Sequence, residues 1–345
     1  MKAVTICKHG GPEAVEVRDV PDPQAAPGEV VIEVHAAALN HLDLWVRNGR
    51  PGMTLKFPHV LGSDASGVVA EVAKGVAGVE PGQEVIVNPV LSCGRCAWCL
   101  RGEQSECPDF SVVGLGRPGT FARRVAVPAA NVYPKPAHLD FVQAAALPLA
   151  HLTAWRMLMT RARVRPGETV LVHGIGGGVA LAGLQIARLA GAAVLATSSS
   201  DEKLDRARAL GAAHTLNYRT DPDVAHWARG ITEGRGVDVV MDTVGAATWP
   251  VDFQAVRRGG RIVLCGVTTG PAAETPLNLL YWNQISVLGS TSGSAEDFRL
   301  MRRSVAAAHL VPVLDRVYPL AKAPEAMARM EEGRQFGKIV LQVSG

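Results

Sequence analysis

Features that would indicate a membrane protein or a nucleic-acid partner are missing from this sequence. The 345 residues carry a net charge of only +3, and no run of like charges stands out. No apolar run reaches the roughly 18 residues that a membrane span requires, and no repeat of fixed period is present. The N-terminal segment MKAVTICKHGGPEAVEV lacks the apolar stretch of a signal peptide. We therefore expect a cytoplasmic protein that binds neither nucleic acid nor membrane.

The composition is that of a globular protein. Hydrophobic residues make up 48% and charged residues 19%, which is sufficient for a core and argues against long disorder. The length suggests two domains of ordinary size.

The rhythm of the sequence changes near residue 151. Before it, strand-like runs such as EVVIEVHAAAL and GVVAEVA are separated by turn-forming segments such as PDPQAAPGE and VEPGQE. After it, the strands ETVLVHG, AVLATS, HTLNY, VDVVMDTVG, GRIVLCGV and ISVLGST alternate with helical stretches. Alternation of this kind predicts crossover units and a parallel sheet. The final segment predicts a helix in SAEDFRLMRRSVAAAHL and a closing strand in KIVLQV.

A glycine-rich loop, LVHGIGGGVALAG, connects the first strand and first helix of the alternating region. Gly174, Gly177 and Ala180 have the spacing G-x-x-G-x-x-A. Small residues let a backbone approach a pyrophosphate, and the start of a helix supplies N–H groups. We expect Gly174, Gly177, Gly178 and Val179 to bind a dinucleotide, because the loop stands between a strand and a helix with a second unit behind it. A tight turn without ligand is the alternative.

The second strand of this region ends without the acidic residue typical of an NAD site. Ser198 and Ser199 stand at that position, Lys203 follows one turn later, and Tyr218 with Arg219 ends the next strand. Hydroxyls and a cation suit a 2′-phosphate, so we predict NADPH rather than NADH. The alternative is that Lys203 and Arg219 are ordinary surface charges. Gly266, near the end of the run GRIVLCGV, is a further candidate for cofactor binding.

Four of the six cysteines cluster in CGRCAWCLRGEQSEC. Cys93, Cys96, Cys99 and Cys107 have the spacing C-x2-C-x2-C-x7-C. In a reducing compartment such a cluster indicates metal ligation rather than disulfides. Four thiolates can surround one zinc and leave no open position, so we predict a structural zinc. An iron–sulfur cluster is the rival, but the long last gap argues against it.

The combination resembles the medium-chain dehydrogenase/reductase superfamily, which includes zinc alcohol dehydrogenases and quinone oxidoreductases. The resemblance covers essentially the whole chain and is carried by GGPEAVEV, AALNHLD, PHVLGSDASGVV, PGQEVIV, PLAHLTAW, FGKIVL, the cysteine cluster and the glycine loop. It implies an α/β fold with a β-rich GroES-like catalytic domain over residues 1–150 and 292–345. A doubly wound Rossmann domain with a parallel sheet would cover residues 151–291, and the zinc lobe would lie near residues 90–110.

The three ligands of the catalytic zinc of alcohol dehydrogenases look replaced here by Asn40, Ser63 and Leu149. Gly62 and Gly67, on either side of Ser63, are expected to remain as turn glycines. NHLD, PLAHLTAW and the glycine loop resemble the zinc-free quinone oxidoreductase branch. Two features depart from that branch: Trp45 stands near a position where many members have Tyr, and the four-cysteine lobe is kept.

Without a Lewis-acid metal, hydride transfer is easier to a substrate that spreads negative charge itself. A quinone or an α,β-unsaturated carbonyl does so, and an enoyl thioester of coenzyme A is equally compatible. We expect Asn40 to donate an amide hydrogen bond to the substrate oxygen, His41 to supply a proton or contact the cofactor, and Asp43 to orient its neighbours. The resemblance implies that Thr153 contacts the nicotinamide, while Trp45, Leu149 and Trp155 shape the pocket. The structural alternatives are that His41 and Asp43 only stabilise the fold and that Trp45 belongs to the core.

Two other functions remain open from the sequence. A relocated catalytic metal bound by residues among His41, Asp43, His59, Asp64 and His151 would restore alcohol dehydrogenase chemistry. A non-catalytic NADPH-binding protein is the other. The segment NQISVLGSTSG, at the expected edge of the Rossmann sheet, predicts a homodimer or a tetramer of dimers through the resemblance.

Overall fold

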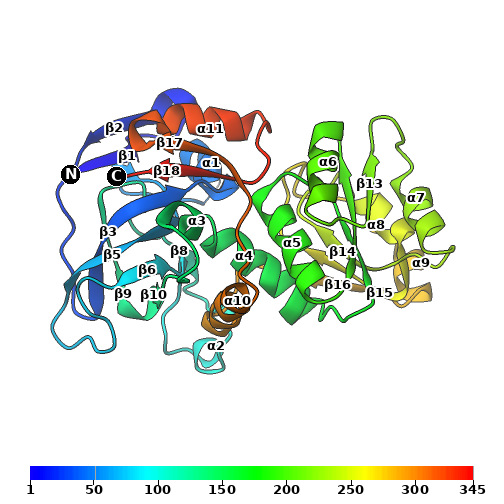
Figure 1. Cartoon of the computed structure of the whole chain (residues 1–345), viewed down its shortest axis with the longest axis horizontal. Coiled ribbons are helices and arrows are strands. Elements are labelled where there is room, and N and C mark those ends of the chain that lie inside the picture. Colours follow the sequence, from blue (N-terminus) through cyan, green and yellow to red (C-terminus); the bar gives the residue numbers. More distant parts are fainter. Residues whose placement is uncertain (51, 345) are drawn as a thin grey trace. The chain divides into compact units, whose positions relative to one another are not determined.

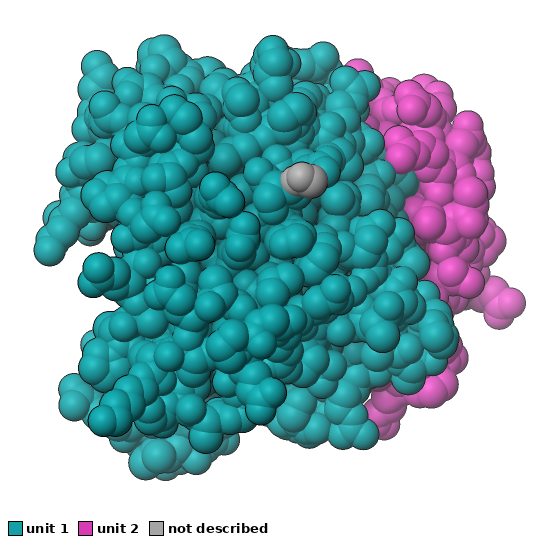
Figure 2. Space-filling view, turned by 60° about the vertical axis from the view of Figure 1, so that its left-hand side comes forward, with its two compact units in different colours: residues 1–150, 294–345 teal, residues 151–293 magenta. Residues whose placement is uncertain are grey.

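The computed structural model describes residues 1–50 and 52–344, which divide into two compact units. Unit 1 comprises Met1–Ala150 and Ser294–Gly345, and unit 2 comprises His151–Gly293 (Figure 2). The sequence places the second boundary at residue 292, and the structure places it at residue 294. Within the described ranges, every helix is too short or too polar to cross a bilayer.

Unit 1 is built mainly from antiparallel strands. Its largest sheet has the order β10-β6-β5-β3-β18-β17, with β9 also paired to β3, and two smaller sheets have the orders β2-β1-β4 and β7-β8. The strands are β1 (Lys2–Ile6), β2 (Val15–Asp19), β3 (Glu29–Ala38), β4 (His59–Val60), β5 (Asp64–Val72), β6 (Glu84–Val87), β7 (Val90–Leu91), β8 (Ser111–Val112), β9 (Arg124–Pro128), β10 (Val132–Pro134), β17 (Leu314–Pro319) and β18 (Lys338–Gln342). Valine, isoleucine and alanine dominate the buried positions of β3, as expected for a strand in the middle of a sheet.

Unit 1 also contains six α-helices among its described residues. They are α1 (His41–Asn48), α2 (Ala97–Leu100), α3 (Phe141–Ala145), α4 (Pro148–Trp155), α10 (Ala295–Ala307) and α11 (Ala323–Glu331); the boundary between the units falls inside α4. Of these, α3 and α11 pack against strands of the main sheet. Asn40 and Asp43 form a capping box at the start of α1, which fixes where this helix begins.

The C-terminal strand completes the main sheet of unit 1. β18 pairs antiparallel with β3, in the register Val340↔Ala38, and parallel with β17 (Figure 1). Leu39 N donates to Ile339 O at 2.9 Å and extends this pairing toward α1. The last strand of the chain is therefore a neighbour of β3 in one sheet, and the first residue of β18, Lys338, lies beside the start of α1.

The two glycines flanking Ser63 have different roles. Gly62 has φ +100°, as a turn glycine does, and a Cβ there would lie 2.3 Å from the Phe121 ring. Gly67 lies inside β5 rather than in a turn, so that expectation is wrong. A Cβ on Gly67 would lie 2.0 Å from Glu33 O of the paired strand β3, so this residue is required by close backbone approach.

Unit 2 contains a parallel sheet of six strands in the order β13-β12-β11-β14-β15-β16. The strands are β11 (Thr169–Val172), β12 (Ala193–Ser198), β13 (His214–Asn217), β14 (Val237–Asp242), β15 (Val256–Leu264) and β16 (Ser286–Gly289), and the helices are α5 (Gly178–Leu189), α6 (Asp201–Ala209), α7 (Val224–Ile231), α8 (Trp249–Ala255) and α9 (Leu277–Trp282). All six residues of β14 are buried, as expected for a central parallel strand. Strand order reverses between β11 and β14, which is the usual position of a ligand site in such folds.

Candidate functional site

A buried carboxylate, Asp64 at the start of β5, organises the polar residues of unit 1. Its Oδ2 accepts hydrogen bonds from Lys338 Nζ at 2.9 Å and from Asn40 Nδ2 at 3.0 Å. Its Oδ1 accepts the backbone N–H of Leu149 at 2.8 Å. Asp64 is fully buried, and a buried charge is tolerated only when it is paired and hydrogen-bonded. We call Asp64, Lys338, Asn40 and the Leu149 amide the Asp64 network.

Lys338 is the residue of this network that the sequence analysis did not identify. Its ammonium donates to Leu39 O at 2.7 Å, to Asn40 Oδ1 at 2.6 Å and to Asp64. An ammonium has three donors, so all of them are engaged within the protein. In the sequence, Lys338 is only a single charged residue at the start of the apolar run KIVLQV. It indicates a buried ion pair only once the neighbours of this strand in the sheet are known.

The three positions interpreted as lost metal ligands lie around Asp64. Asn40 and Leu149 both contact its carboxylate, and Ser63 precedes it in the chain. Ser63 is fully buried, and its hydroxyl has no hydrogen-bond partner among the described residues. The positions at which we expected the ligands of a catalytic zinc to be missing thus include an amide, that of Asn40, and a hydroxyl, that of Ser63. The Lys338 ammonium contacts Asn40 and Asp64 there.

Lys338 fixes the orientation of the Asn40 amide. Because an ammonium cannot accept a hydrogen bond, Asn40 Oδ1 must face Lys338 and Nδ2 must face Asp64. Nδ2 also donates to Ala38 O, at a long 3.4 Å. The expected hydrogen bond from Asn40 to a substrate oxygen is available only by exchange of this longer contact.

The other two predicted catalytic residues lie in the first turn of α1. Asp43 is buried, and its Oδ2 accepts the Asn40 N–H at 2.7 Å, so it holds the backbone of Asn40 in place. Burial raises the pKa of Asp43 to about 7. His41 is the first residue of the helix and its side chain is exposed; desolvation by the surrounding protein and then the charge of Lys338 lower its pKa. Its imidazole is consequently neutral at neutral pH.

The four cysteines of the predicted zinc lobe converge. Their four sulfur atoms lie within 4.8 Å of one another, and the Cys93–Cys99, Cys96–Cys107 and Cys107–Cys93 separations are 3.9, 3.8 and 3.6 Å. Sulfurs at 2.3 Å from a central zinc in a tetrahedron are about 3.8 Å apart, so the lobe fits a four-coordinate zinc. Backbone N–H groups of Arg95 and Cys96 lower the pKa of Cys93 to about 6, which favours the thiolate that a metal binds.

The glycine loop of unit 2 has the geometry of an anion site. Gly174 and Gly176 have φ +63° and +137°, conformations that favour glycine. Ile175 N donates to Thr197 O at 2.8 Å, which ties the loop to β12. No side chain caps the start of α5, so the first-turn N–H groups of Gly178 and Val179 are oriented as donors for a phosphate.

The expected ribose-binding residues are brought together by the pairing of β12 and β13. Ser198 stands opposite Asn217 in the register, and Tyr218 N donates to Ser198 O at 3.1 Å. Ser200 caps α6 by accepting the N–H of Lys203, so Ser199 and Lys203 flank this strand end. Asp201, which the sequence analysis passed over, accepts a hydrogen bond from Asn217 Nδ2 at 2.8 Å.

Comparison with known proteins agrees with both units. The alcohol dehydrogenase GroES-like domain profile matches residues 26–137, and the zinc-binding dehydrogenase profile matches residues 178–307. A zinc-type alcohol dehydrogenase-like protein of Schizosaccharomyces pombe is 34% identical over 92% of this chain and 91% of its own length. A quinone oxidoreductase of Sus scrofa is 29% identical over 99% of this chain and 97% of its own. The crystal structure of an NAD-dependent alcohol dehydrogenase, 47% identical, superposes with a TM-score of 0.95 over 100% of both chains.

The chain belongs to the medium-chain dehydrogenase/reductase superfamily. It is therefore an NAD(P)-dependent oxidoreductase with a GroES-like domain and a Rossmann domain, as the sequence predicts. When bound, the nicotinamide cofactor supplies the hydride, and in this superfamily member the glycine loop and the start of α5 would hold its pyrophosphate.

The structure does not support the relocated metal site of the alternative hypothesis. Within residues 1–50 and 52–344, only the four cysteines bring three or more ligand atoms together. His59 is buried and its Nε2 lies 2.9 Å from Gly114 O, and both oxygens of Asp64 are engaged. The carboxylate that a cation would need in unit 1 is thus already paired with the ammonium of Lys338.

The remaining predicted residues occupy defined positions. Thr153 and Trp155 are buried in α4, and His151 Nε2 contacts Gln185 Oε1 at 3.2 Å. Trp45 is half-buried, with the Arg50 guanidinium 3.8 Å from the centre of its ring.

Gly266 lies against the residue after β14, since a Cβ there would be 2.4 Å from Thr243 O. One glycine was missed: a Cβ on Gly183 would lie 2.4 Å from Met241 Sδ, so Gly183 lets α5 pack closely on β14.

Measurement of the zinc content tests two predictions: that the four cysteines bind zinc and that the Asp64 network does not. We expect about one zinc per chain in chelator-washed protein, and loss of that zinc in Cys96→Ser. The melting temperature should then fall by roughly 5–10 °C, because bound zinc contributes folding free energy and Gln104 links the lobe to the start of α10 at Ala295 N, 3.1 Å away.

The matched control is Cys7→Ser, which removes an exposed cysteine outside the lobe and should keep both the zinc and the melting temperature. Two zinc ions per washed chain, or an unchanged zinc content in Cys96→Ser, would contradict this assignment.

Proposed function

We propose that the chain reduces quinones or α,β-unsaturated carbonyls with NADPH and uses no metal at the Asp64 network. The observation that carries the proposal is the ammonium of Lys338, which lies 2.6–2.9 Å from Leu39 O, Asn40 Oδ1 and Asp64 Oδ2. Of the three positions that look like replaced zinc ligands, Asn40 contacts this ammonium, Leu149 donates its N–H to Asp64, and Ser63 precedes Asp64 in the chain. A conjugated substrate suits such a site because it delocalises the negative charge that forms on its oxygen.

In this proposal the residues of unit 1 bind and protonate the substrate. The reaction adds a hydride to carbon or to the quinone and a proton to oxygen or the α-carbon, so two electrons and two hydrogens are gained. Asn40 Nδ2 donates to the substrate oxygen in exchange for Ala38 O, and Lys338 and Asp43 keep its amide and backbone in position. The neutral imidazole of His41 relays the proton: as one ring nitrogen donates to the substrate, the other accepts a proton from solvent, so the ring is neutral again after the transfer.

Removal of the Asn40 amide tests this assignment. We expect Asn40→Ala to lower kcat for a quinone or enone by about 10²-fold, the usual cost of losing one donor to a developing oxyanion, with the KM for NADPH unchanged. Steady-state kinetics with both substrate classes measures it. Asn278→Ala, an exposed asparagine on α9, is the matched control and should keep wild-type rates.

Equal rates in Asn40→Ala and Asn278→Ala would remove Asn40 from the mechanism. Circular dichroism and zinc content of each variant separate a chemical effect from misfolding. Absence of turnover with every quinone and enone, despite NADPH binding, would instead favour the non-catalytic alternative.

We further propose a preference for NADPH over NADH. Support comes from Ser198 and Ser199 at the end of β12 and from Lys203 and Tyr218 beside them, where an acidic residue would otherwise bind the ribose 2′-hydroxyl. We expect Ser199→Asp to lower the ratio of kcat/KM for NADPH to that for NADH at least tenfold, because a carboxylate repels a 2′-phosphate. Ser199→Asn, which has the same shape without charge, is the control and should change the ratio by less than threefold. A wild-type ratio below one would refute the preference.

Oxidation of an alcohol is the second candidate function. The names of two relatives favour it: the 47% identical structure is described as an NAD-dependent alcohol dehydrogenase, and the 34% identical sequence as a zinc-type alcohol dehydrogenase-like protein. The same kinetic assay should therefore include simple alcohols with NAD⁺ and NADP⁺. Turnover of alcohols that depends on added zinc would favour this candidate over the metal-free one.

We also propose that the protein forms a homodimer, or a tetramer of dimers, through unit 2. β16 has no second neighbour in the described sheet, and Val287 on it is 41% exposed. The adjacent helix α9 exposes Leu277, Tyr281 and Trp282 by 66–71%. An unpaired strand edge beside a large apolar surface suits pairing with a second copy.

A charge on the β16 edge should weaken that association. We expect the wild-type protein to have at least twice the chain mass in light scattering after gel filtration and Val287→Lys to shift toward the monomer. Val317→Lys, on the edge strand β17 of unit 1 and 40% exposed, is the control and should keep the wild-type mass. A monomeric wild-type protein would refute the proposal.

A further inference from the structure

A second polar site lies on unit 2 at the amino ends of the parallel strands, whereas the glycine loop lies at their carboxyl ends. It is a cavity of about 720 Å³, whose lining includes Arg229, Arg235, Arg257, Arg258, Asp238 and Asn283. Its volume falls within the range of about 300–1,000 Å³ that is typical of small-molecule sites. We call it the arginine cavity.

The topology separates the arginine cavity from the cofactor loop. Asp238 is the second residue of β14, and Arg257 and Arg258 are the second and third residues of β15. The glycine loop follows the last residue of β11, Val172, at the other end of the parallel strands. Because strands rise about 3.3 Å per residue, the amino and carboxyl ends of a strand as long as β14 lie roughly 20 Å apart.

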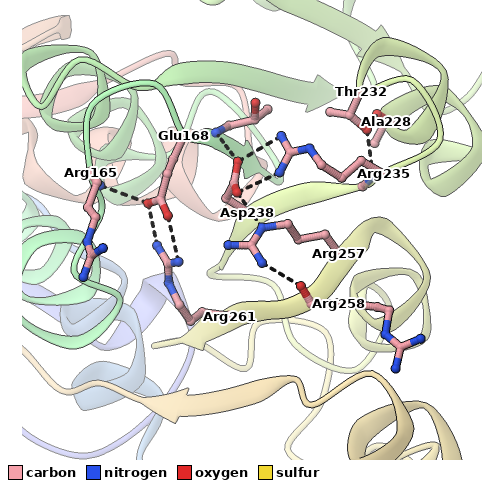
Figure 3. A network of polar contacts seen from close by, with 11 residues as sticks. Arg165, Glu168, Ala228, Thr232, Arg235, Asp238, Arg257, Arg258 and Arg261 are labelled. Carbon is pink, nitrogen blue, oxygen red and sulfur yellow. Dashed lines mark hydrogen bonds and ion pairs between the residues drawn. The ribbon is translucent and has the colours of Figure 1, made fainter.

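The arginines of this cavity outnumber the carboxylates available to them. Arg235 donates to both oxygens of Asp238, at 2.8 and 3.3 Å, and Arg257 Nε donates to the same carboxylate at 2.6 Å (Figure 3). One carboxylate thus serves two guanidinium groups. The neighbouring Arg261 is already neutralised by a two-pronged pair with Glu168 and adds no free charge (Figure 3).

The other two arginines have no carboxylate partner among the described residues. Arg229 donates to the backbone oxygens of Gln254, Gly234 and Val256, where it also caps the end of α8. The side chain of Arg258 makes a single hydrogen bond, from Nη2 to Trp282 O at 3.1 Å. Of the five N–H donors of its guanidinium, most remain available.

The charge balance of the lining is permanently positive. Four arginines and one aspartate give 4 − 1 = +3, and counting Glu233, which lines an adjoining cavity, leaves +2. Arginine does not lose its proton at accessible pH, so this excess does not depend on titration. The whole chain carries only +3, so a comparable charge is concentrated in one concave site.

We propose that the arginine cavity binds a small multivalent oxyanion, of the pyrophosphate or polyphosphate class. Planar guanidinium forks match phosphate oxygens and pair with them through two hydrogen bonds. The concave shape and the small number of arginines suit a compact anion rather than a long nucleic acid. Inorganic polyphosphate and the phosphate chain of a nucleotide share this chemistry.

Calorimetric titration of the full-length protein saturated with NADPH tests the proposal. NADPH fills the glycine loop, so an added anion cannot bind there. Sodium tripolyphosphate should bind saturably, one per chain, in buffer held at constant ionic strength with sodium chloride. It should also raise the melting temperature, because a ligand of the folded state alone stabilises it.

Substitution of Arg258 locates the site. Its side chain is exposed and makes one backbone contact, so Arg258→Gln should fold and bind tripolyphosphate about tenfold more weakly. Arg258→Lys keeps the charge but loses the fork and should fall between the two. Arg303→Gln removes one exposed arginine from α10 of unit 1 and should stay within twofold of the wild type.

Two outcomes would overturn the proposal: absence of saturable binding once NADPH is bound, or equal affinities in Arg258→Gln and Arg303→Gln. A parallel titration with ATP distinguishes the sources. Tighter binding of ATP than of tripolyphosphate identifies a nucleotide, and equal binding identifies the phosphate chain alone. The titrations involve no turnover, so they are independent of the proposed quinone or enone reduction.

Discussion

The buried ion pair between Lys338 and Asp64 is the interaction on which unit 1 depends. It joins residues 274 positions apart and fastens β18, the last strand of the chain, to the start of β5. Loss of one partner would leave a buried charge unpaired, at a cost of about 3–5 kcal/mol. The same pair orients the Asn40 amide and, through Asp64, holds the backbone of Leu149. Closure of the fold and arrangement of the polar site are therefore one event.

This arrangement gives a physical answer to the altered residues near Ser63. A catalytic zinc and a lysine ammonium both bring positive charge to a carboxylate, but the ammonium uses three hydrogen bonds where a metal uses coordinate bonds. With Lys338 bound by Leu39 O, Asn40 and Asp64, the positive charge is already present and fully satisfied. In the metal-free site that we propose, no histidine ligand would be needed at position 63.

Unit 2 has two groups of anion-attracting residues, one at the carboxyl ends and one at the amino ends of its parallel strands. At the carboxyl ends of the strands, glycine conformations and uncapped helix N–H groups favour an anion without any side-chain charge. At the amino ends of the strands, Arg229 donates to Gln254 O and Val256 O at the end of α8, where free carbonyl groups attract cations, and to Gly234 O in the loop after α7. The direction of the helices explains why some arginine is favourable there. It does not account for Arg258, which has no carboxylate partner among the described residues and whose side chain contacts only Trp282 O.

Features that depend on local spacing could be predicted from the sequence. The four cysteines fall within 15 residues, and the glycine loop lies between one strand and one helix, so short connections bring their atoms together whatever the rest of the chain does. The alternation of strands and helices predicted the parallel sheet, because each strand is followed by a helix that returns the chain to the same end of the sheet. The network of Lys338, Asp64 and Asn40, the role of Gly67 inside a strand, and the arginine cavity were decided only by the tertiary structure. Each depends on which strands become neighbours, and that choice is made by burial of the whole core rather than by any local run of residues.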